Sequence, residues 1–389
     1  MTYATLNPTR RTLMGPGPSD THPRVLSAIS APTLGHLDPE FIVIMDEIKE
    51  MLQKVYCTKN ELTMPISATG SAGMEACLVN TIEPGDRVVI AQNGVFAGRM
   101  ADIVGRLGGE LVLVDAEWGK IVPVEKVISA IDGKKTKLVG IVHAETSTGV
   151  CQPLQDIAKA AHEVDALILA DCVTSLGGIP VEIDNWGIDL AYSGTQKCLS
   201  CPPGLSPITF SDRAVEVLKN RKSKVASWYL DLTMLINYWG GDRIYHHTAP
   251  VNMLYGLREA LILFLEEGQE NVFKRHQINH KALVGGIESM GLKMLVDPEF
   301  RLPQLNTICV PDTIDETLVR QQLLQNYNIE VGAGLGSLKG KVWRVGQMGH
   351  ASRRENITLF LSALGTILNT QGFSNDTSSA LSRASSFYN

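Results

Sequence analysis

The sequence predicts an α/β protein with a large domain on a mostly parallel sheet and a smaller C-terminal α+β domain. Its length of 389 residues favours two domains. Short apolar segments of strand length alternate with helical segments up to about residue 210, as in a parallel sheet covered by helices. After about residue 268 a long amphipathic helix and short strands follow, which is typical of an α+β unit.

The N-terminal region is predicted to be an extended arm over residues 1–20. Its "GPGP" stretch at 15–18 cannot be helical, because proline fixes φ and restricts the residue before it. Residues 40–55 follow with apolar side chains at helical spacing, so they predict a helix.

The large domain is predicted over residues 21–267. A Gly/Ser/Thr loop at 67–73 leads into a helix that Pro84 and Gly85 end. Strands are predicted at 87–91, 110–115, 137–146 and 166–171, with further sheet segments at 189–197 and 205–210. Helices are predicted at 98–108, 154–164 and 254–268.

The small domain is predicted over residues 268–370. It would contain a helix at 269–290 and short strands at 306–310, 328–334 and 342–347. The remaining residues, 371–389, are rich in serine, so we expect a disordered tail.

Composition excludes several classes of function. Charged residues make up 20% of the chain and the net charge is −6, so nucleic acid is not an expected partner. The seven cysteines are scattered and odd in number, which indicates a reducing compartment. Since the apolar runs are too short for a membrane span and the first residues lack a secretory signal, we expect a cytoplasmic protein.

Candidate functional residues follow the predicted strands. Thr146 and Asp171 end two of them, Lys197 follows a third, and the loop at 67–73 precedes a helix. Ligands of open α/β sheets bind beyond the carboxyl ends of the strands, so we expect these residues in one crevice.

Lys197 and Asp171 each allow a functional and a structural interpretation. Lys197 follows the uncharged run "SGTQ", where a desolvated lysine would be a neutral amine able to form a Schiff base; it could instead extend its amine to solvent at a sheet edge. Asp171 could hold a cation in a buried pocket or cap the next element. The loop at 67–73 could bind a phosphate at a helix N-terminus or simply begin a helix.

Three further features have alternatives of the same kind. Arg344, on a predicted strand, could bind a carboxylate through two hydrogen bonds or form a surface ion pair. Cys198 and Cys201 form a C-x-x-C pair without a second pair for zinc, so we interpret them as small buried residues, with metal or redox chemistry as the alternative. The histidines at 246 and 247 lack nearby ligands, and no metal site is predicted.

The chain resembles the class V, fold-type I aminotransferases that depend on pyridoxal 5′-phosphate, above all those of the alanine–glyoxylate and serine–pyruvate type. The resemblance covers nearly all of the chain up to about residue 370. The matching segments are "GPGPS" (15–19), "MDEIKE" (45–50), "HAETSTGV" (143–150), "DCVTSLGG" (171–178), "SGTQK" (193–197), "YHHT" (245–248) and "WRVG" (343–346).

The resemblance implies roles for individual residues. Lys197 would form the Schiff base with the cofactor, and Asp171 would pair with its ring nitrogen. Val173 and Phe96 would pack on the two ring faces, and Thr146 would bond the pyridoxal oxygen and face the substrate. The phosphate would be bound by Thr69, Gly70, Ser71 and Gln196 and, from the partner subunit of a homodimer, by Tyr245 and Thr248. Arg344 would bind the substrate carboxylate, and Gly35 with the "GPGP" segment would wall the substrate pocket.

The implied reaction is transamination of a small amino acid, alanine or serine, with glyoxylate or pyruvate as acceptor. Gln196 replaces the histidine of relatives that desulfurise cysteine, which argues against that activity. Alternatives are a class V aminotransferase with aspartate or an aminophosphonate as donor, a Schiff-base lyase without this cofactor, and a non-catalytic subunit of the same fold.

Overall fold

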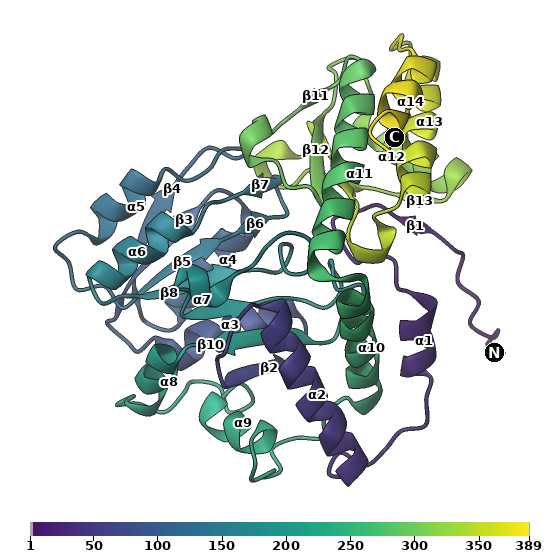
Figure 1. Cartoon of the computed structure of the whole chain (residues 1–389). Coiled ribbons are helices and arrows are strands. Elements are labelled where there is room, and N and C mark those ends of the chain that lie inside the picture. Colours follow the sequence, from purple (N-terminus) through teal and green to yellow (C-terminus); the bar gives the residue numbers. More distant parts are fainter. Residues whose placement is uncertain (1–2, 389) are drawn as a thin grey trace.

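The protein is represented by a computed structural model that describes residues 3–388. Figure 1 shows a large twisted sheet among helices, with a smaller sheet and the C-terminal helices above it. The large sheet has seven strands within these residues, in the order β2-β10-β9-β8-β5-β3-β4. They are β2 (Leu62–Ile66), β3 (Arg87–Gln92), β4 (Glu110–Asp115), β5 (Leu138–Val142), β8 (Leu167–Asp171), β9 (Leu190–Tyr192) and β10 (Ser206–Phe210).

The direction of the strands confirms the predicted α/β class. Within the described part of the chain, β10 is the one strand of this sheet that runs antiparallel to both neighbours. The pairs β9–β8, β8–β5, β5–β3 and β3–β4 are all parallel. Every residue of β5 and β8 is buried, as expected for a parallel sheet covered on both faces.

One predicted strand is divided in the structure. We expected a single strand over 137–146, but β5 ends at Val142 and the chain forms the hairpin β6 (Ala144–Glu145) and β7 (Val150–Cys151). Gly149 has a φ of +84°, which most other residues would adopt only at a cost, so this glycine allows the tight turn. The hairpin thereby places Thr146 in a turn beyond the sheet.

The helices predicted around the large sheet are present, together with others that were not predicted. Residues 40–55 form α2, where Pro39 occupies the first turn and the Asp38 side chain accepts a hydrogen bond from the Glu40 amide. The helices of this part are α1 (Pro23–Ile29), α2 (Pro39–Val55), α3 (Gly70–Thr81), α4 (Val95–Arg106), α5 (Val124–Ile131), α6 (Gln155–Glu163), α7 (Ile183–Trp186), α8 (Asp212–Lys219), α9 (Leu232–Trp239) and α10 (Val251–Glu267). Of these, α2, α3, α4, α6 and α10 were predicted, whereas α1, α5, α7, α8 and α9 were not.

A second, antiparallel sheet with its own core lies toward the C-terminus. Its strands are β11 (Lys293–Met294), β12 (Leu305–Cys309), β15 (Val342–Gly346) and β14 (Gly332–Ala333), in that order. Around it lie α11 (Gln269–Ser289), α12 (Glu316–Tyr327), α13 (Arg354–Thr370) and three short 3₁₀ turns at Pro298–Phe300, Gly336–Leu338 and Gly349–Ala351. Buried residues such as Trp343 and Phe360 form this core, separate from that of the large sheet.

The N-terminal arm connects the two cores. Its strand β1 (Thr12–Leu13) pairs with β13 (Ile329–Glu330), and Met14 is buried in the second core. Five residues later, the Ser19 amide donates to the Gln196 carbonyl at 2.8 Å, beside Lys197. The "GPGP" stretch therefore spans from the second core to the lysine loop, visible in Figure 1 as the purple chain passing below β13.

The predicted disordered tail is wrong for most of its length. Residues Thr377–Ser385 form α14, whose N-cap is Asp376 and which packs against α11 and α13. Ala380 and Ala384 are buried in the second core, four residues apart and so on one face of the helix. The helix was not predicted because its apolar face consists of two small alanines within a serine-rich segment. Asn389 lies outside the described residues.

The division into domains at residues 21–267 and 268–370 stays a prediction. Within residues 3–388, no helix is long and apolar enough to cross a lipid bilayer.

Ala380→Asp is expected to detach α14, because it places a carboxylate in a fully buried position. A buried polar group without partners costs ~1–3 kcal/mol in proteins. Hydrogen–deuterium exchange should then show faster exchange of the amides of residues 377–388. Ser382→Asp is the control, since Ser382 is exposed on the same helix; equal protection in the two variants would contradict the docking of α14.

Candidate active site

The polar residues that follow the strands of the large sheet lie at one edge of it. Asp171 is the last residue of β8, and its carbonyl accepts a hydrogen bond from the His143 amide just beyond β5. The next strand, β9, ends at Tyr192 and leads into the run that carries Lys197. The predicted gathering of these residues at the carboxyl ends of parallel strands follows from this topology.

Asp171 is a buried carboxylate with two hydrogen-bond donors. Its Oδ1 accepts from the Val173 amide at 2.8 Å, and its Oδ2 accepts from the Tyr192 hydroxyl at 2.6 Å. Within residues 3–388, no lysine, arginine or histidine nitrogen lies within 4.0 Å of it. Burial raises the pKa of Asp171 to about 7, although both hydrogen bonds oppose the rise. The geometry suits a bound group that carries a positive charge.

Lys197 presents a buried amine. Only 8% of the residue is exposed, and its Nζ donates to the Pro16 carbonyl of the N-terminal arm. Burial, and next the positive charge of Arg344, lower the pKa of Lys197 to about 8. A Cβ added to Gly17 would lie 2.6 Å from this Nζ, so glycine is needed where the arm crosses the amine. Much of the amine is therefore neutral and nucleophilic near pH 8.

Arg344 reaches the same cluster from the second sheet. Its Nε donates to the Ala333 carbonyl at 2.7 Å, and its Nη1 donates to the Thr146 carbonyl at 3.1 Å. Burial lowers the pKa of Arg344 to about 10, and among the described residues no carboxylate oxygen lies within 4.0 Å of its nitrogens. Since a guanidinium has five N–H donors, several stay available for an anionic ligand.

Thr146 and its neighbour in space, Thr174, form a hydroxyl pair. The two Oγ1 atoms are 2.5 Å apart, and both residues are buried. The hairpin turn therefore supplies a carbonyl to Arg344 and a hydroxyl within the site.

The predicted phosphate loop lies at the N-terminus of α3. Thr69 is the N-cap but makes no side-chain capping bond, and both Thr69 and Ser71 are exposed. A Cβ on Gly70 would stand 3.4 Å from the Ser193 carbonyl and from Val173, so the backbone approaches the lysine loop closely. The half-buried Gln196 has an Oε1 without a hydrogen-bond partner in the described chain. Free helix N–H groups at such a position bind anions.

Phe96 and Val173 come from separate elements. Phe96 lies in the first turn of α4, is half-buried, and has the Arg99 guanidinium 4.7 Å from its ring centre. Val173 stands two residues beyond Asp171 and contacts the glycine loop. Their roles as the two walls of a ring site stay predictions.

Three predicted residues are not in this cluster. Tyr245 is 54% exposed, and its hydroxyl lies 3.3 Å from that of Thr248, which is exposed too. Gly35 is exposed in the loop between α1 and α2, where a Cβ would meet only Asp38, at 4.0 Å. Within one described chain, no side-chain hydrogen bond joins any of these three residues to Asp171, Lys197 or Arg344.

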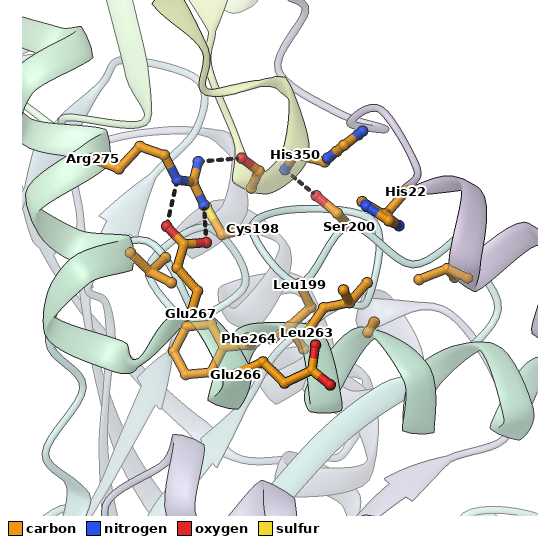
Figure 2. Close-up of a pocket in the computed structure, with 14 residues that line it drawn as sticks. His22, Cys198, Leu199, Ser200, Leu263, Phe264, Glu266, Glu267, Arg275 and His350 are labelled. Carbon is orange, nitrogen blue, oxygen red and sulfur yellow. Dashed lines mark hydrogen bonds and ion pairs between the residues drawn. The ribbon is translucent and has the colours of Figure 1, made fainter.

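The turn after Lys197 lines a separate cavity of about 360 Å³. Figure 2 shows Arg275 between Glu267 and the 349–350 turn, and the His350 amide donating to Ser200 at 2.8 Å. Cys198 lies at the back of this cavity, and burial raises the pKa of Cys198 and of Cys201 to about 12. Thiols that stay protonated are poor ligands and nucleophiles, which favours the interpretation of both as small buried residues.

The sequence analysis missed two residues that hold the cluster together. The Tyr192 hydroxyl donates to Asp171 and orients its carboxylate. Tyr192 could have been predicted from the sequence because it is the last residue of the strand that pairs with β8. Glu145 is fully buried and directly precedes Thr146. It could have been predicted as a functional residue because it is a carboxylate within an apolar strand.

Comparisons with known proteins agree with this geometry. The family model of "Aminotransferase class-V" matches residues 16–360. An alanine–glyoxylate aminotransferase of Callithrix jacchus is 42% identical over 358 residues, which covers 91% of this chain and 86% of that protein.

Two solved structures resemble the chain over nearly its whole length. The alanine–glyoxylate aminotransferase of Nostoc sp. has a TM-score of 0.93 and 47% identity, with 95% of this chain and 98% of that chain covered. The ureidoglycine–glyoxylate aminotransferase of Bacillus subtilis has a TM-score of 0.97 and 40% identity, with 99% and 100% covered.

Asp171→Asn is expected to stabilise the ligand-free protein at alkaline pH. The pKa of Asp171 rises from 3.8 to about 7 on folding, so the folded state keeps a proton that the unfolded state releases. Stability is therefore lost as the pH rises through this window, and asparagine removes a penalty on the order of 2–4 kcal/mol at pH 8. Urea denaturation between pH 4.5 and 8.5 should show that the free energy of unfolding of Asp171→Asn exceeds that of the parent protein at pH 8.5, and that this difference decreases toward pH 4.5.

Asp189→Asn is the matched control for this measurement. Asp189 is buried to the same degree but contacts Arg213 at 3.0 Å, so the substitution should destabilise the protein. A gain for Asp171→Asn that does not vary with pH would contradict the titration of Asp171.

Proposed function

The chain belongs to the class-V aminotransferase family, and from that premise we propose that it transfers the amino group of alanine or serine to glyoxylate or pyruvate. Its fold is that of the fold-type I enzymes, and its cofactor is pyridoxal 5′-phosphate. The proposal concerns the substrates and the residues that carry the reaction.

One observation carries the proposal: a buried carboxylate, a buried amine and a buried guanidinium share a cluster without ion pairs between them. Asp171, Lys197 and Arg344 are each less than a tenth exposed, and among described residues none forms an ion pair. Burying such groups is costly unless a ligand complements them. An amino acid together with a cationic ring offers charges complementary to both Asp171 and Arg344.

The residues present fit the cofactor. Asp171 supplies an anion for a protonated ring nitrogen, and the N-terminus of α3 with Gly70 supplies N–H groups for a phosphate. Phe96 and Val173 supply apolar surfaces for the ring. When bound, pyridoxal 5′-phosphate supplies an aldehyde carbon for the amino group and a ring that accepts electrons.

The chain's own residues then move and hold protons. The Lys197 amine, with a pKa of about 8, takes a proton from the substrate Cα and later returns one. Asp171 keeps the proton at the ring nitrogen, and the Tyr192 hydroxyl keeps the carboxylate oriented. The available N–H groups of Arg344 bind the substrate carboxylate and turn the Cα–H toward Lys197.

The names of the relatives support a small acceptor substrate. The relatives from Callithrix jacchus, Nostoc sp. and Bacillus subtilis are all named for glyoxylate, which supports glyoxylate as the acceptor.

A second donor has support from one comparison. The Bacillus subtilis relative is named for ureidoglycine and matches the chain with a TM-score of 0.97. Ureidoglycine is therefore the second candidate donor, before aspartate and aminophosphonates.

The protein is expected to be a homodimer with shared sites. Tyr245 and Thr248 are exposed with adjacent hydroxyls, which suits a contribution to the phosphate site of a partner subunit. Exposed Ile244 precedes Tyr245, and exposed Trp228 stacks on His246, so both offer apolar contact surface beside them. Light scattering should give twice the 42.3 kDa chain mass; a monomer with full activity would exclude shared sites.

Lys197→Ala is expected to abolish transamination, because no other buried amine of the described chain occupies the cluster. A loss of at least about 10²–10⁴-fold is typical when a general base is removed. The measurement is the single-turnover reaction with L-alanine, followed by the absorbance of the bound cofactor and the release of pyruvate. A panel of alanine, serine, ureidoglycine, aspartate and an aminophosphonate against glyoxylate and pyruvate then ranks the substrates.

Lys135→Ala is the control, since Lys135 is exposed and outside the site. Substantial turnover by Lys197→Ala without added amine would refute the assignment. An adduct trapped by borohydride without any pyridoxal phosphate would instead indicate a Schiff-base lyase.

A further inference from the structure

Glu145 is a fully buried glutamate that the reaction above does not use. Its Oε1 accepts hydrogen bonds from the Ser147 amide at 2.9 Å and the Ser147 hydroxyl at 2.6 Å. Its Oε2 accepts from the Phe96 amide at 3.2 Å. The carboxylate thus joins the hairpin turn after β6 to the first turn of α4.

The helix α4 depends on these two side chains for its N-terminus. Its N-cap residue is Gly94, which has no side chain to accept from the first amides. The Ser147 hydroxyl accepts from the Val95 amide at 3.0 Å, and Glu145 takes the next one. A Cβ on Gly94 would collide with Cγ and Cδ of Glu145, so the glycine gives the glutamate its space.

The same residue fixes the turn that contacts Arg344. The Glu145 carbonyl accepts from the Gly149 amide at 2.8 Å, which closes the turn from Thr146 to Gly149. The Thr146 carbonyl in this turn accepts from Arg344 at 3.1 Å. Glu145 therefore connects Phe96 on one side with Thr146 and Arg344 on the other.

The charge of Glu145 also acts on the cluster. Its carboxylate opposes the lowering of the pKa of Arg344 and of Lys197 that burial causes, although no ion pair within 4.0 Å joins them in the described chain. A simple helix cap at the protein surface would have no such coupling to the site.

We propose that Glu145 is a positioning residue of the transamination site, which holds Phe96 of α4 in register with the turn that presents Thr146 to Arg344. The inference rests on the proposed function. According to this inference, the Glu145 carboxylate determines where Phe96 and Arg344 lie relative to each other.

The test compares Glu145→Gln with Glu83→Gln. Glu83 accepts hydrogen bonds from the amides of Lys222 and Ser223 and from the Ser223 hydroxyl, so the two glutamates make similar contacts. It lies beyond the C-terminal end of α3, about 18 Å along the helix from Gly70. Each substitution removes the negative charge of a glutamate that accepts three hydrogen bonds. Glutamine can keep the contacts of Glu83, which all end on Oε1, but not all of those of Glu145, which uses both oxygens.

For Glu145→Gln we expect the dissociation constant of pyridoxal phosphate and the KM for L-alanine to rise about tenfold to a hundredfold, with an altered visible circular dichroism of the bound cofactor. Glu83→Gln should leave all three unchanged. If Glu145→Gln does not fold, Ser147→Ala replaces it, since it removes the hydroxyl that bonds both Glu145 and Val95; its effects should be smaller and in the same direction.

A lower melting temperature with unchanged cofactor affinity, KM and circular dichroism would overturn the inference, because Glu145 would then serve stability alone. If the parent protein itself neither binds the cofactor nor transaminates, the proposed function fails instead. The two failures are therefore distinguishable in the same set of assays.

Discussion

The central constraint on this structure is the burial of Asp171 with no lysine, arginine or histidine of residues 3–388 in ion-pair contact with it. A carboxylate in that position is tolerated because the Tyr192 hydroxyl and the Val173 amide bond it, and because its pKa rises to about 7. Under the proposed function, the cost of keeping this carboxylate ionised would be offset by a ligand that carries positive charge. The end of β8 would then serve both the fold and the cofactor.

The site is assembled from two cores, which explains why it needs the whole chain. Asp171 ends β8 and Lys197 follows β9 of the large sheet, while Thr146 lies in the turn of the hairpin β6–β7. Arg344 belongs to β15 of the second sheet. The Arg344 guanidinium of the second sheet donates to the Thr146 carbonyl of the hairpin turn, so a hydrogen bond joins the two parts at the site. The relative placement of the two cores thereby sets the distance between Lys197 and Arg344.

Much of this arrangement could be predicted from the sequence, and the misses have physical reasons. Asp171 and Lys197 were recognisable because apolar strands end in polar residues at one edge of a parallel sheet. Tyr192 and Glu145 were missed because their roles depend on contacts between elements, which spacing along the chain does not contain. The tail was predicted as disordered because two alanines, Ala380 and Ala384, give α14 a small buried face. Gly35, Tyr245 and Thr248 lie apart from the cluster in one chain, and their roles stay predictions.

The segment from Met14 to Ser19, which passes over Lys197, is anchored at both ends. It therefore links the second core to the loop that carries Lys197. Met14 is fixed to the second core through the carbonyl of Glu330 and the amide of Gly346, while Ser19 is fixed to the lysine loop. Between these anchors, the Pro16 carbonyl accepts from the amine itself. A rotation of one core relative to the other would therefore move this short segment, and with it the Pro16 carbonyl that accepts from the Lys197 amine. The position of the second core is thereby linked to the Lys197 amine.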